Sequence, residues 1–189
     1  MPFTKTTDDG RQAILVRDAV RADLAAITAI YGHHVLTGVG SFEEVPPAAD
    51  EMAARLARVQ DAGLPWLVAE REGAVVGYAY AGRYRERSAY RYTVEDSVYV
   101  DAGHAGQGIG VRLLAEVVRH CTDLGYRQMI AVIGGSENES SRRLHARCGF
   151  RESGCQRAVG LKFGRWLDIV EMQRTLGEGA ETLPPDAVR

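Results

Sequence analysis

Apolar residues recur at helical spacing in four segments of the chain and follow strand-like patterns in seven others. Helices are predicted to begin near Asp23 and to run over 48–59, 108–124 and 138–147. Strands are predicted over 13–17, 66–70, 75–84, 92–100, 128–133, 157–163 and 166–173, with a tight turn at Glu72-Gly73. The order β-α-α-β-β-β-α-β-α-β-β fits neither a doubly wound nucleotide fold nor a sandwich. It predicts a mixed α/β sheet with helices on both faces.

The length of 189 residues suits one domain, which we place at 13–175, with residues 1–12 and 177–189 as flexible tails. The formal net charge of -2 gives no field that would favour nucleic acid or an anionic membrane as a partner. No apolar run approaches the ~20 residues that span a bilayer, and the polar N-terminus does not resemble a secretory signal. We therefore expect a cytoplasmic protein.

The three cysteines, Cys121, Cys148 and Cys155, are an odd number without CxxC spacing. Free thiols in a reducing compartment are the plain interpretation. A catalytic cysteine is the alternative, but Cys121 and Cys148 fall at apolar positions of helical patterns.

A glycine-rich segment lies between the fourth predicted strand and a long helix. Gly106, Gly108 and Gly110 stand at alternate positions, which lets the backbone approach a ligand closely. The unpaired N–H groups and the dipole of the following helix suit phosphate or pyrophosphate. The segment matches neither the Walker loop nor the GxGxxG dinucleotide fingerprint. The alternative is a tight turn that needs glycine for steric reasons.

The predicted strand over 92–100 carries acidic residues among apolar ones. Alternation places Glu95, Ser97 and Tyr99 on one face and Val94, Asp96, Val98 and Val100 on the other. A partly desolvated carboxylate there would have a raised pKa and could act as a general base. The alternative is a structural ion pair with a nearby arginine.

Three polar residues share one face of the helix predicted over 138–147. Asn138, Ser141 and His145 stand at i, i+3 and i+7, and this stripe of amide, hydroxyl and imidazole is typical of a surface that faces a ligand. The alternative is that Asn138 caps the helix and His145 is a partly buried, hydrogen-bonded histidine.

A cluster of arginines precedes the acidic strand. Arg83, Arg85, Arg87 and Arg91 fall within nine residues. The arginine fork matches a carboxylate or phosphinate in two-point contact. The alternative is a solvated loop at the sheet edge.

Together these segments resemble the GNAT superfamily of acetyl-CoA-dependent N-acetyltransferases over roughly 13–175. The superfamily's pyrophosphate loop is matched by 105–110, although Ala105 stands where Gln or Arg is usual. Its later segment is matched by Asn138, Ser141, His145, Gly149 and Phe150, with His145 where many members have a tyrosine acid. The resemblance implies an α/β (α+β) fold. It has a mixed, mainly antiparallel sheet of about seven strands, split between the fourth and fifth strands.

Within the superfamily, the chain is most similar to phosphinothricin and methionine sulfoximine or methionine sulfone acetyltransferases. The similar strings are 90–100, 131–134 and 162–168, and 41–43 stands where those enzymes have a substrate-side loop. The resemblance implies a small amino-acid substrate, a homodimer and a possible role in detoxification. The sequence does not rank the three substrates.

The resemblance also implies acetyl-CoA as co-substrate, without a metal. Its pyrophosphate would rest on the N–H groups of the glycine loop, and its pantetheine would pair with the fourth strand. The expected cofactor-binding residues are Val98, Tyr99, Val100, Gly106, Gln107, Gly108, Ile109, Gly110, Val111, Asn138 and Ser141.

Direct transfer in a ternary complex is the implied mechanism. Glu95 would remove a proton from the substrate amine through a water, and a backbone N–H near Val98 would stabilise the oxyanion. His145 would be the acid for the leaving thiolate, or would orient the substrate or relay the base. The expected substrate-binding residues are Phe42, Glu43, Arg85, Glu86, Arg87, Ser88 and Thr93.

Two other functions compete with this interpretation. One is acetylation of another amine, such as a protein N-terminus, a polyamine or an aminoglycoside, for which an acidic cleft would be expected. The other is a non-catalytic module that binds acyl-CoA and regulates a partner, which would need neither Glu95 nor His145.

Overall fold

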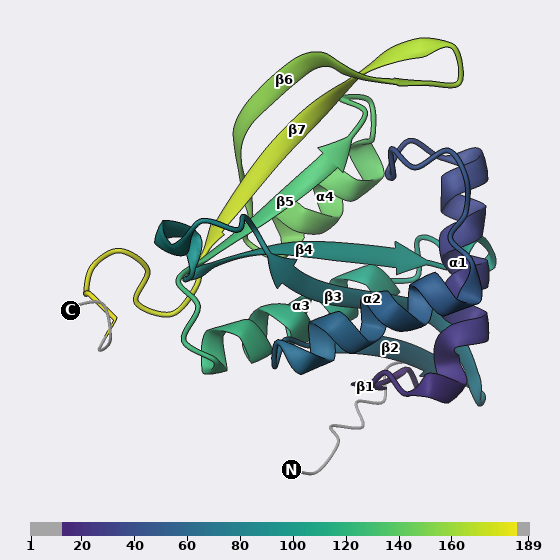
Figure 1. Ribbon diagram of the computed structural model, residues 1–189, viewed down its shortest axis with the longest axis horizontal. Coiled ribbons are helices and arrows are strands. Elements are labelled where there is room, and N and C mark those ends of the chain that lie inside the picture. The colour runs from purple at the N-terminus through teal and green to yellow at the C-terminus, as the bar shows by residue number, and fades with distance from the viewer. Residues whose placement is uncertain (1–12, 185–189) are drawn as a thin grey trace.

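The computed structural model describes residues 13–184, and its centre is one seven-stranded sheet (Figure 1). The strands are β1 (Leu15–Asp18), β2 (Trp66–Arg71), β3 (Ala74–Arg83), β4 (Thr93–Val100), β5 (Gln128–Gly134), β6 (Arg151–Lys162) and β7 (Arg165–Thr175). They lie in the order β1-β2-β3-β4-β5-β7-β6. Neighbours are antiparallel except β4 and β5, which are parallel. The predicted mixed, mainly antiparallel sheet is confirmed.

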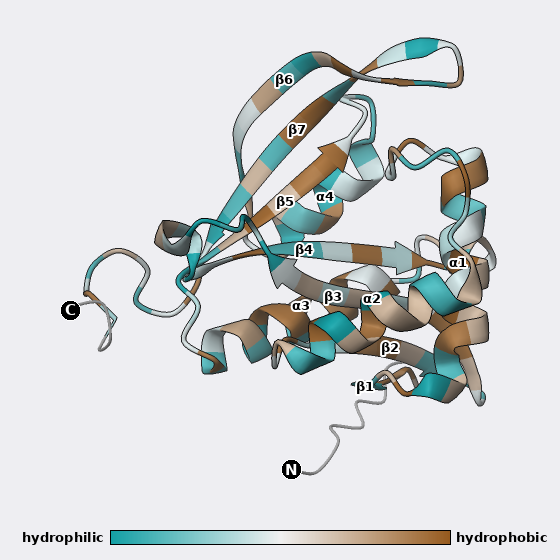
Figure 2. Ribbon diagram, in the orientation of Figure 1, coloured by the Kyte–Doolittle hydropathy of each residue, from teal (hydrophilic) through white to brown (hydrophobic). Residues whose placement is uncertain are grey.

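Helices cover both faces of this sheet. They are α1 (Leu24–Thr37), α2 (Ala49–Asp61), α3 (Ile109–Asp123) and α4 (Glu139–Arg147). The core has two parts: α1 and α2 pack on one face around Tyr78, and α3 packs on the other around Leu113. Each fully buried leucine or valine contributes roughly 1.5–3 kcal/mol through the apolar surface it removes from water. Figure 2 shows the hydrophobic colour along the inner strand β5, and a mixed pattern along the edge strand β6.

One predicted strand is longer than its pattern indicated. The strand expected over 157–163 begins at Arg151. Its pairing with β7 shifts register between Glu152 and Gly154 and again between Gln156 and Gly160. Such bulges break the two-residue alternation, and most of β6 is exposed, so no regular pattern marked where the strand starts.

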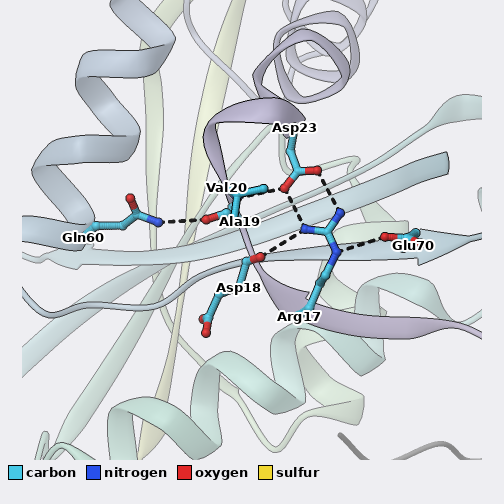
Figure 3. Close-up of polar contacts among 7 residues, drawn as sticks. All are labelled: Arg17, Asp18, Ala19, Val20, Asp23, Gln60 and Glu70. Carbon is cyan, nitrogen blue, oxygen red and sulfur yellow. Dashed lines mark hydrogen bonds and ion pairs between the residues drawn. The ribbon is translucent and has the colours of Figure 1, made fainter. Parts of the chain in front are cut away.

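An ion-pair cluster fixes the first strand to the first helix (Figure 3). Nη1 and Nη2 of Arg17 lie 2.8 and 2.9 Å from the two carboxylate oxygens of Asp23, and its Nε lies 2.9 Å from Glu70 on β2. Asp23 also accepts a hydrogen bond of 2.8 Å from the backbone N–H of Val20. These bonds hold the pKa of Asp23 below its usual range, with the Arg17 hydrogen bond as the largest cause. The cluster sets where α1 starts relative to the sheet.

Part of the expected tails lies outside the described residues, including 1–12. Of the expected C-terminal tail, 177–184 are described, and 177–180 form a turn. Arg127 contacts Glu178 and Thr182 there, at 3.3 and 3.2 Å. The division into one domain and two flexible tails stays a prediction. Between residues 13 and 184, no helix has the length and apolarity needed to cross a bilayer.

Candidate functional site

A cleft of about 940 Å³ lies where β4 and β5 separate. The two strands pair only from Thr93↔Gln128 to Asp96↔Ala131, so β4 continues beyond the pairing to Val100 and β5 to Gly134. The cleft is lined by segments far apart in the sequence. The sequence-predicted residues in its lining are Phe42, Glu95, Val98, Tyr99, Val100, Gly106, Gly108, Ile109, Gly110, Val111, Asn138, Ser141 and His145.

The other sequence-predicted residues do not line the cleft. The side chain of Gln107 contacts Arg71, and Glu43 lies 2.8 Å from Arg55 on α2. The remaining ones precede β4 or begin it. They are Arg85, Glu86, Arg87, Ser88 and Thr93. Their roles in substrate binding, and that of Gln107 with the cofactor, stay predictions.

The far half of β4 has one open edge. The N–H of Asp101 donates to the carbonyl of Val76 on β3 at 3.0 Å, and alternation in an antiparallel pair then turns the backbone of Tyr99 and Ser97 toward β3 as well. The N–H and C=O of Val98 therefore face the cleft, where no described strand pairs with them. An open strand edge of this kind accepts an extended, amide-containing ligand.

The glycines of the loop before α3 serve different purposes. Gly106 and Gly108 have φ of +74° and +79°, and a Cβ added to either would meet nothing within 4 Å. Their requirement for glycine is therefore conformational, not the steric one that the sequence left open. Gly110 lies inside α3, where an added Cβ would come within 2.4 Å of Leu144. Together they bring the N-terminus of α3 to the cleft wall.

Glu95 is a desolvated carboxylate in the cleft wall. Burial is the largest cause that raises its pKa, to about 7, and the charges of Asp96 and Glu171 act in the same direction. The Arg85 guanidinium acts weakly the other way, so Arg85 is near enough for its charge to affect Glu95. A carboxylate with this pKa can accept a proton near neutral pH.

Asp96 and His145 form a buried pair on the opposite face of β4. Nε2 of His145 lies 3.0 Å from Oδ2 of Asp96, and Nδ1 lies 2.8 Å from the carbonyl oxygen of Ser141. Burial lowers the pKa of His145, but the hydrogen bond and charge of Asp96 outweigh it and raise the pKa above its ordinary value. The alternative for an acid in this strand was a structural ion pair with an arginine. For Asp96 the partner is His145 instead, which the pattern of the strand could not identify. Both ring nitrogens already have partners.

Asn138 both caps α4 and faces the cleft, so both interpretations of this residue hold. Its side chain accepts a hydrogen bond of 3.3 Å from the N–H of Ser141, which makes it the N-cap of α4, and it also lines the cleft. His145 lies on the same helix face as Ser141, as the spacing predicted, and its burial agrees with the alternative interpretation.

Two functional candidates in this region were missed by the sequence. Nε2 of His34 on α1 donates to the carbonyl oxygen of Val100 at 2.8 Å, and its ring lies against that of Tyr99. Lys162 is buried at the end of β6 and contacts the loop after α1. The pair His33-His34 follows no motif spacing and gave no signal, but Lys162 had one, since it is one of only two lysines beside 21 arginines.

The arginine segment is an exposed turn between β3 and β4, outside the cleft lining. The guanidinium of Arg85 stacks over the rings of Tyr84 and Tyr90, with 4.9 and 5.7 Å to their centroids. These rings orient a cation that remains free to meet an anion from solvent.

Neither a reactive buried thiol nor a metal-binding cluster is found among the described residues. Cys121 and Cys148 are buried free thiols and Cys155 is an exposed one, as predicted. Burial raises the pKa of Cys121 to about 12, which leaves it unreactive. Within residues 13–184, no group of three or more His, Cys, Asp or Glu side chains is arranged to hold a metal ion.

Comparison with known proteins gives consistent matches. Residues 29–150 match the model of the Acetyltransferase (GNAT) family. The chain is 56% identical over 174 residues to a phosphinothricin N-acetyltransferase from Alcaligenes faecalis, covering 92% of this chain and 88% of the relative. It is 42% identical over 172 residues to an L-methionine sulfoximine/L-methionine sulfone acetyltransferase from Salmonella typhimurium, covering 91% and 98%.

A solved structure adds the fold. The phosphinothricin acetyltransferase from Sinorhizobium meliloti, in complex with acetyl-CoA, is 51% identical and superposes with a TM-score of 0.89, covering 92% of this chain and 94% of that one. The family model, the sequence identity and the split sheet agree with one another. The chain therefore belongs to the acetyltransferase (GNAT) family.

Proposed function

We propose that this protein transfers the acetyl group of acetyl-CoA to the α-amino group of a small amino-acid analogue. Candidate substrates are phosphinothricin, methionine sulfoximine and methionine sulfone, which are the substrates in the names of its relatives. The observation that carries the proposal is the position of Glu95, a desolvated carboxylate with a pKa of about 7 in the wall of the split between β4 and β5. Detoxification of such compounds is the proposed role.

The cleft fits acetyl-CoA in its shape and in its hydrogen-bonding groups. The N–H groups at the start of α3, next to Gly108, suit a pyrophosphate because they are unpaired and lie at the positive end of the helix dipole. The outward-facing C=O of Val98 suits an amide N–H of a pantetheine arm. Asn138 and Ser141 face the same cleft from α4. When bound, acetyl-CoA supplies the thioester whose acetyl group is transferred.

The reaction needs a neutral amine, and Glu95 provides the means to make one. Most of a substrate α-amine is protonated at neutral pH, and only the neutral form attacks a thioester carbonyl. Glu95 takes this proton, directly or through one water. As the C–N bond forms and the C–S bond breaks, the N–H of Val98 stabilises the charge on the acetyl oxygen. The thiolate leaves and takes up the second proton, which the substrate nitrogen loses as the amide forms.

His145 is poorly placed to act as a general acid, because both of its ring nitrogens are hydrogen-bonded within the protein. Its Nδ1 carries a proton because the carbonyl of Ser141 can only accept, and its Nε2 is bonded to Asp96. A proton from His145 can reach the thiolate only if one of these bonds breaks. We propose that His145 and Asp96 mainly fix α4 against β4 and so hold Asn138 and Ser141 at the cleft.

The substrate's anionic groups would meet Arg85. Arg85 is exposed, its guanidinium is stacked over two rings, and its charge lowers the pKa of Glu95. A single amino-acid substrate can therefore place its amine at Glu95 and its carboxylate or tetrahedral oxygens at Arg85.

The test is release of free CoA thiol from acetyl-CoA by the purified protein at about pH 8, where more amine is neutral. Phosphinothricin, methionine sulfoximine and methionine sulfone would be compared with spermidine and an N-terminal peptide. Release confined to the first three is the expected result. Release only with spermidine or peptide would transfer the activity to another amine class, and binding without turnover would favour a regulatory module.

We also propose that the protein is a homodimer, through the β6–β7 hairpin. Exposed apolar side chains gather there, namely Val159, Leu161, Phe163 and Trp166, the last 66% exposed. A soluble monomer seldom exposes such a group without a partner. Light scattering after gel filtration should give twice the monomer mass, and Trp166→Glu should shift the mass to that of the monomer.

A further inference from the structure

The segment between α1 and α2 crosses from one half of the split sheet to the other. It leaves α1 at Thr37 and forms neither helix nor strand before Ala49. Figure 1 shows it reaching the end of β5 beneath the β6–β7 hairpin. Its residues Val39, Gly40 and Phe42 line the cleft. We call residues 38–44 the strap.

Lys162, the last residue of β6, holds the strap through two backbone carbonyls. Its Nζ donates to the carbonyl of Gly38 at 2.9 Å and to that of Ser41 at 2.7 Å, and the residue is only 2% exposed. The chain uses arginine at 21 of its 23 basic positions. A compact ammonium with three donors fits where two carbonyls converge in a buried space, whereas a planar guanidinium does not. The use of lysine here is therefore explained by this contact.

Phe42 is wedged between the far strands at the same place. A Cβ added to Gly160 on β6 would come within 2.1 Å of its ring, and one added to Gly134 on β5 within 2.8 Å. Gly134 would also meet the carbonyl oxygen of Val39 at 2.1 Å. The two glycines are thus required because the strap lies directly on both strands.

The near half of the sheet holds the strap as well. The hydroxyl of Ser41 is hydrogen-bonded to that of Tyr31 on α1 at 2.9 Å, and Glu43 pairs with Arg55 on α2. Residues 38–44 are therefore fixed to α1 and α2 on one side and to β5 and β6 on the other.

We infer that Lys162 is a positioning residue that closes the open end of the cleft by tying the strap to the second half of the sheet. The pairing of β4 with β5 joins the halves at one end, and the strap joins them at the other. Between these two closures lies the space for the substrate, with Phe42 as its fixed wall. Lys162 thereby sets which amine substrates fit, an inference that rests on the proposed function.

The test removes the donors but keeps the size of the side chain. In Lys162→Met, a glutamyl endopeptidase under native conditions should cleave after Glu43 or Glu44 about tenfold faster than in the wild type, as followed by mass spectrometry of the fragments. KM for the amino-acid substrate should rise about tenfold, while the Kd of acetyl-CoA stays unchanged. Lys162→Arg keeps the charge but replaces the compact ammonium with a guanidinium that does not fit between the two carbonyls, so it should not restore either readout.

Arg151→Met is the matched control, because it removes an exposed charge from the same strand far along from the strap. It should leave both readouts at the wild-type level. If Lys162→Met does not fold, Phe42→Ala tests the same wall and should raise KM for the amine at unchanged acetyl-CoA affinity.

The outcomes separate the two proposals. Cleavage and KM at wild-type levels in Lys162→Met, or an unchanged KM in Phe42→Ala, overturn the role of the strap. Absence of turnover in the wild type with every amine overturns the proposed function, but the proteolysis result still decides whether Lys162 holds the strap.

Discussion

Nε2 of His145 on α4 lies 3.0 Å from Oδ2 of Asp96 on β4, and the side chains are only 4% and 1% exposed. The contact joins two segments 49 residues apart at the floor of the split between β4 and β5. Burying such a pair costs desolvation energy, so the pair itself adds little net stability. Removing one partner is strongly destabilising, because the other charge is then buried without compensation. It also leaves Glu95, on the other face of β4, as the carboxylate available for proton transfer.

Asp96→Ala should destabilise the protein by about 3 kcal/mol at pH 6, because it leaves a buried imidazolium without its partner. The pKa of His145 is raised in the folded state, so this stability is complete below the ordinary pKa of about 6.5 and is lost as pH rises through the folded value. Urea unfolding at pH 6 and pH 9 should show a larger loss at pH 6.

Ser141→Ala is the control for this effect. It removes a hydroxyl 3.3 Å from Nδ1 of His145 but keeps the carbonyl that accepts the stronger bond. Its cost should be much smaller at both pH values. An equal loss for Asp96→Ala at pH 6 and pH 9 would show that charge plays no part in the pair.

Glu95→Gln should lower kcat by a factor of about 10²–10⁴, the usual contribution of a general base, with the affinity for acetyl-CoA nearly unchanged. In the wild type, kcat should rise with pH through about 7, as Glu95 loses its proton and becomes a base. This limb should be absent in the variant. Steady-state kinetics between pH 5.5 and 9 and calorimetric titration of acetyl-CoA measure both effects.

Glu95→Gln should lower activity but raise the stability of the folded protein. The pKa of Glu95 is raised from 4.5 to about 7 on folding, so its ionisation costs the folded state roughly 3 kcal/mol above pH 7 and nothing below pH 4.5. Glu95→Gln should therefore be more stable than the wild type at pH 8. Wild-type activity in the variant would remove Glu95 from the mechanism.

Arg85→Ala should raise KM for the amino-acid substrate about tenfold, with little change in kcat, because a charged two-point contact is lost from binding. It should also shift the pH limb of kcat upward, since the charge of Arg85 lowers the pKa of Glu95. Arg91→Ala, which removes another cation stacked on a tyrosine in the same segment, is the control. An unchanged KM in Arg85→Ala would assign the carboxylate contact to another residue.

Gly108→Ala should cost about 1 kcal/mol of stability, because alanine resists the positive φ of this position even though its Cβ meets no atom. It should also raise the Kd of acetyl-CoA, since relaxation of φ turns the N–H groups at the start of α3 away from the cleft. Gly125→Ala provides the comparison. It has φ of +84° and equally open surroundings, but it follows the other end of α3.

For the glycine pair, thermal unfolding should show similar losses in both variants, while isothermal titration should show weaker binding only in Gly108→Ala. Weaker binding in both would mean that general loosening of α3, and not the geometry of its N-terminus, controls the affinity.

Local pattern was sufficient for much of this protein. Between residues 13 and 184, helical and alternating periodicity predicted the four α-helices and the seven strands apart from the first half of β6, because each buries one face against the sheet or helix beside it. The alternation along β4 correctly put Glu95 and Asp96 on opposite faces. The spacing of Asn138, Ser141 and His145 correctly put them on one helix face. The glycine loop and the family's motifs were enough to predict the fold and the family.

Contacts between distant segments were decided only by the tertiary structure. No periodicity indicates that Asp96 meets His145, that Lys162 meets the carbonyls of Gly38 and Ser41, or that Phe42 rests on Gly134 and Gly160. Each depends on how the sheet halves diverge after Asp96. Local sequence determines which face a side chain takes, but the partner on that face is determined by the packing of the whole chain.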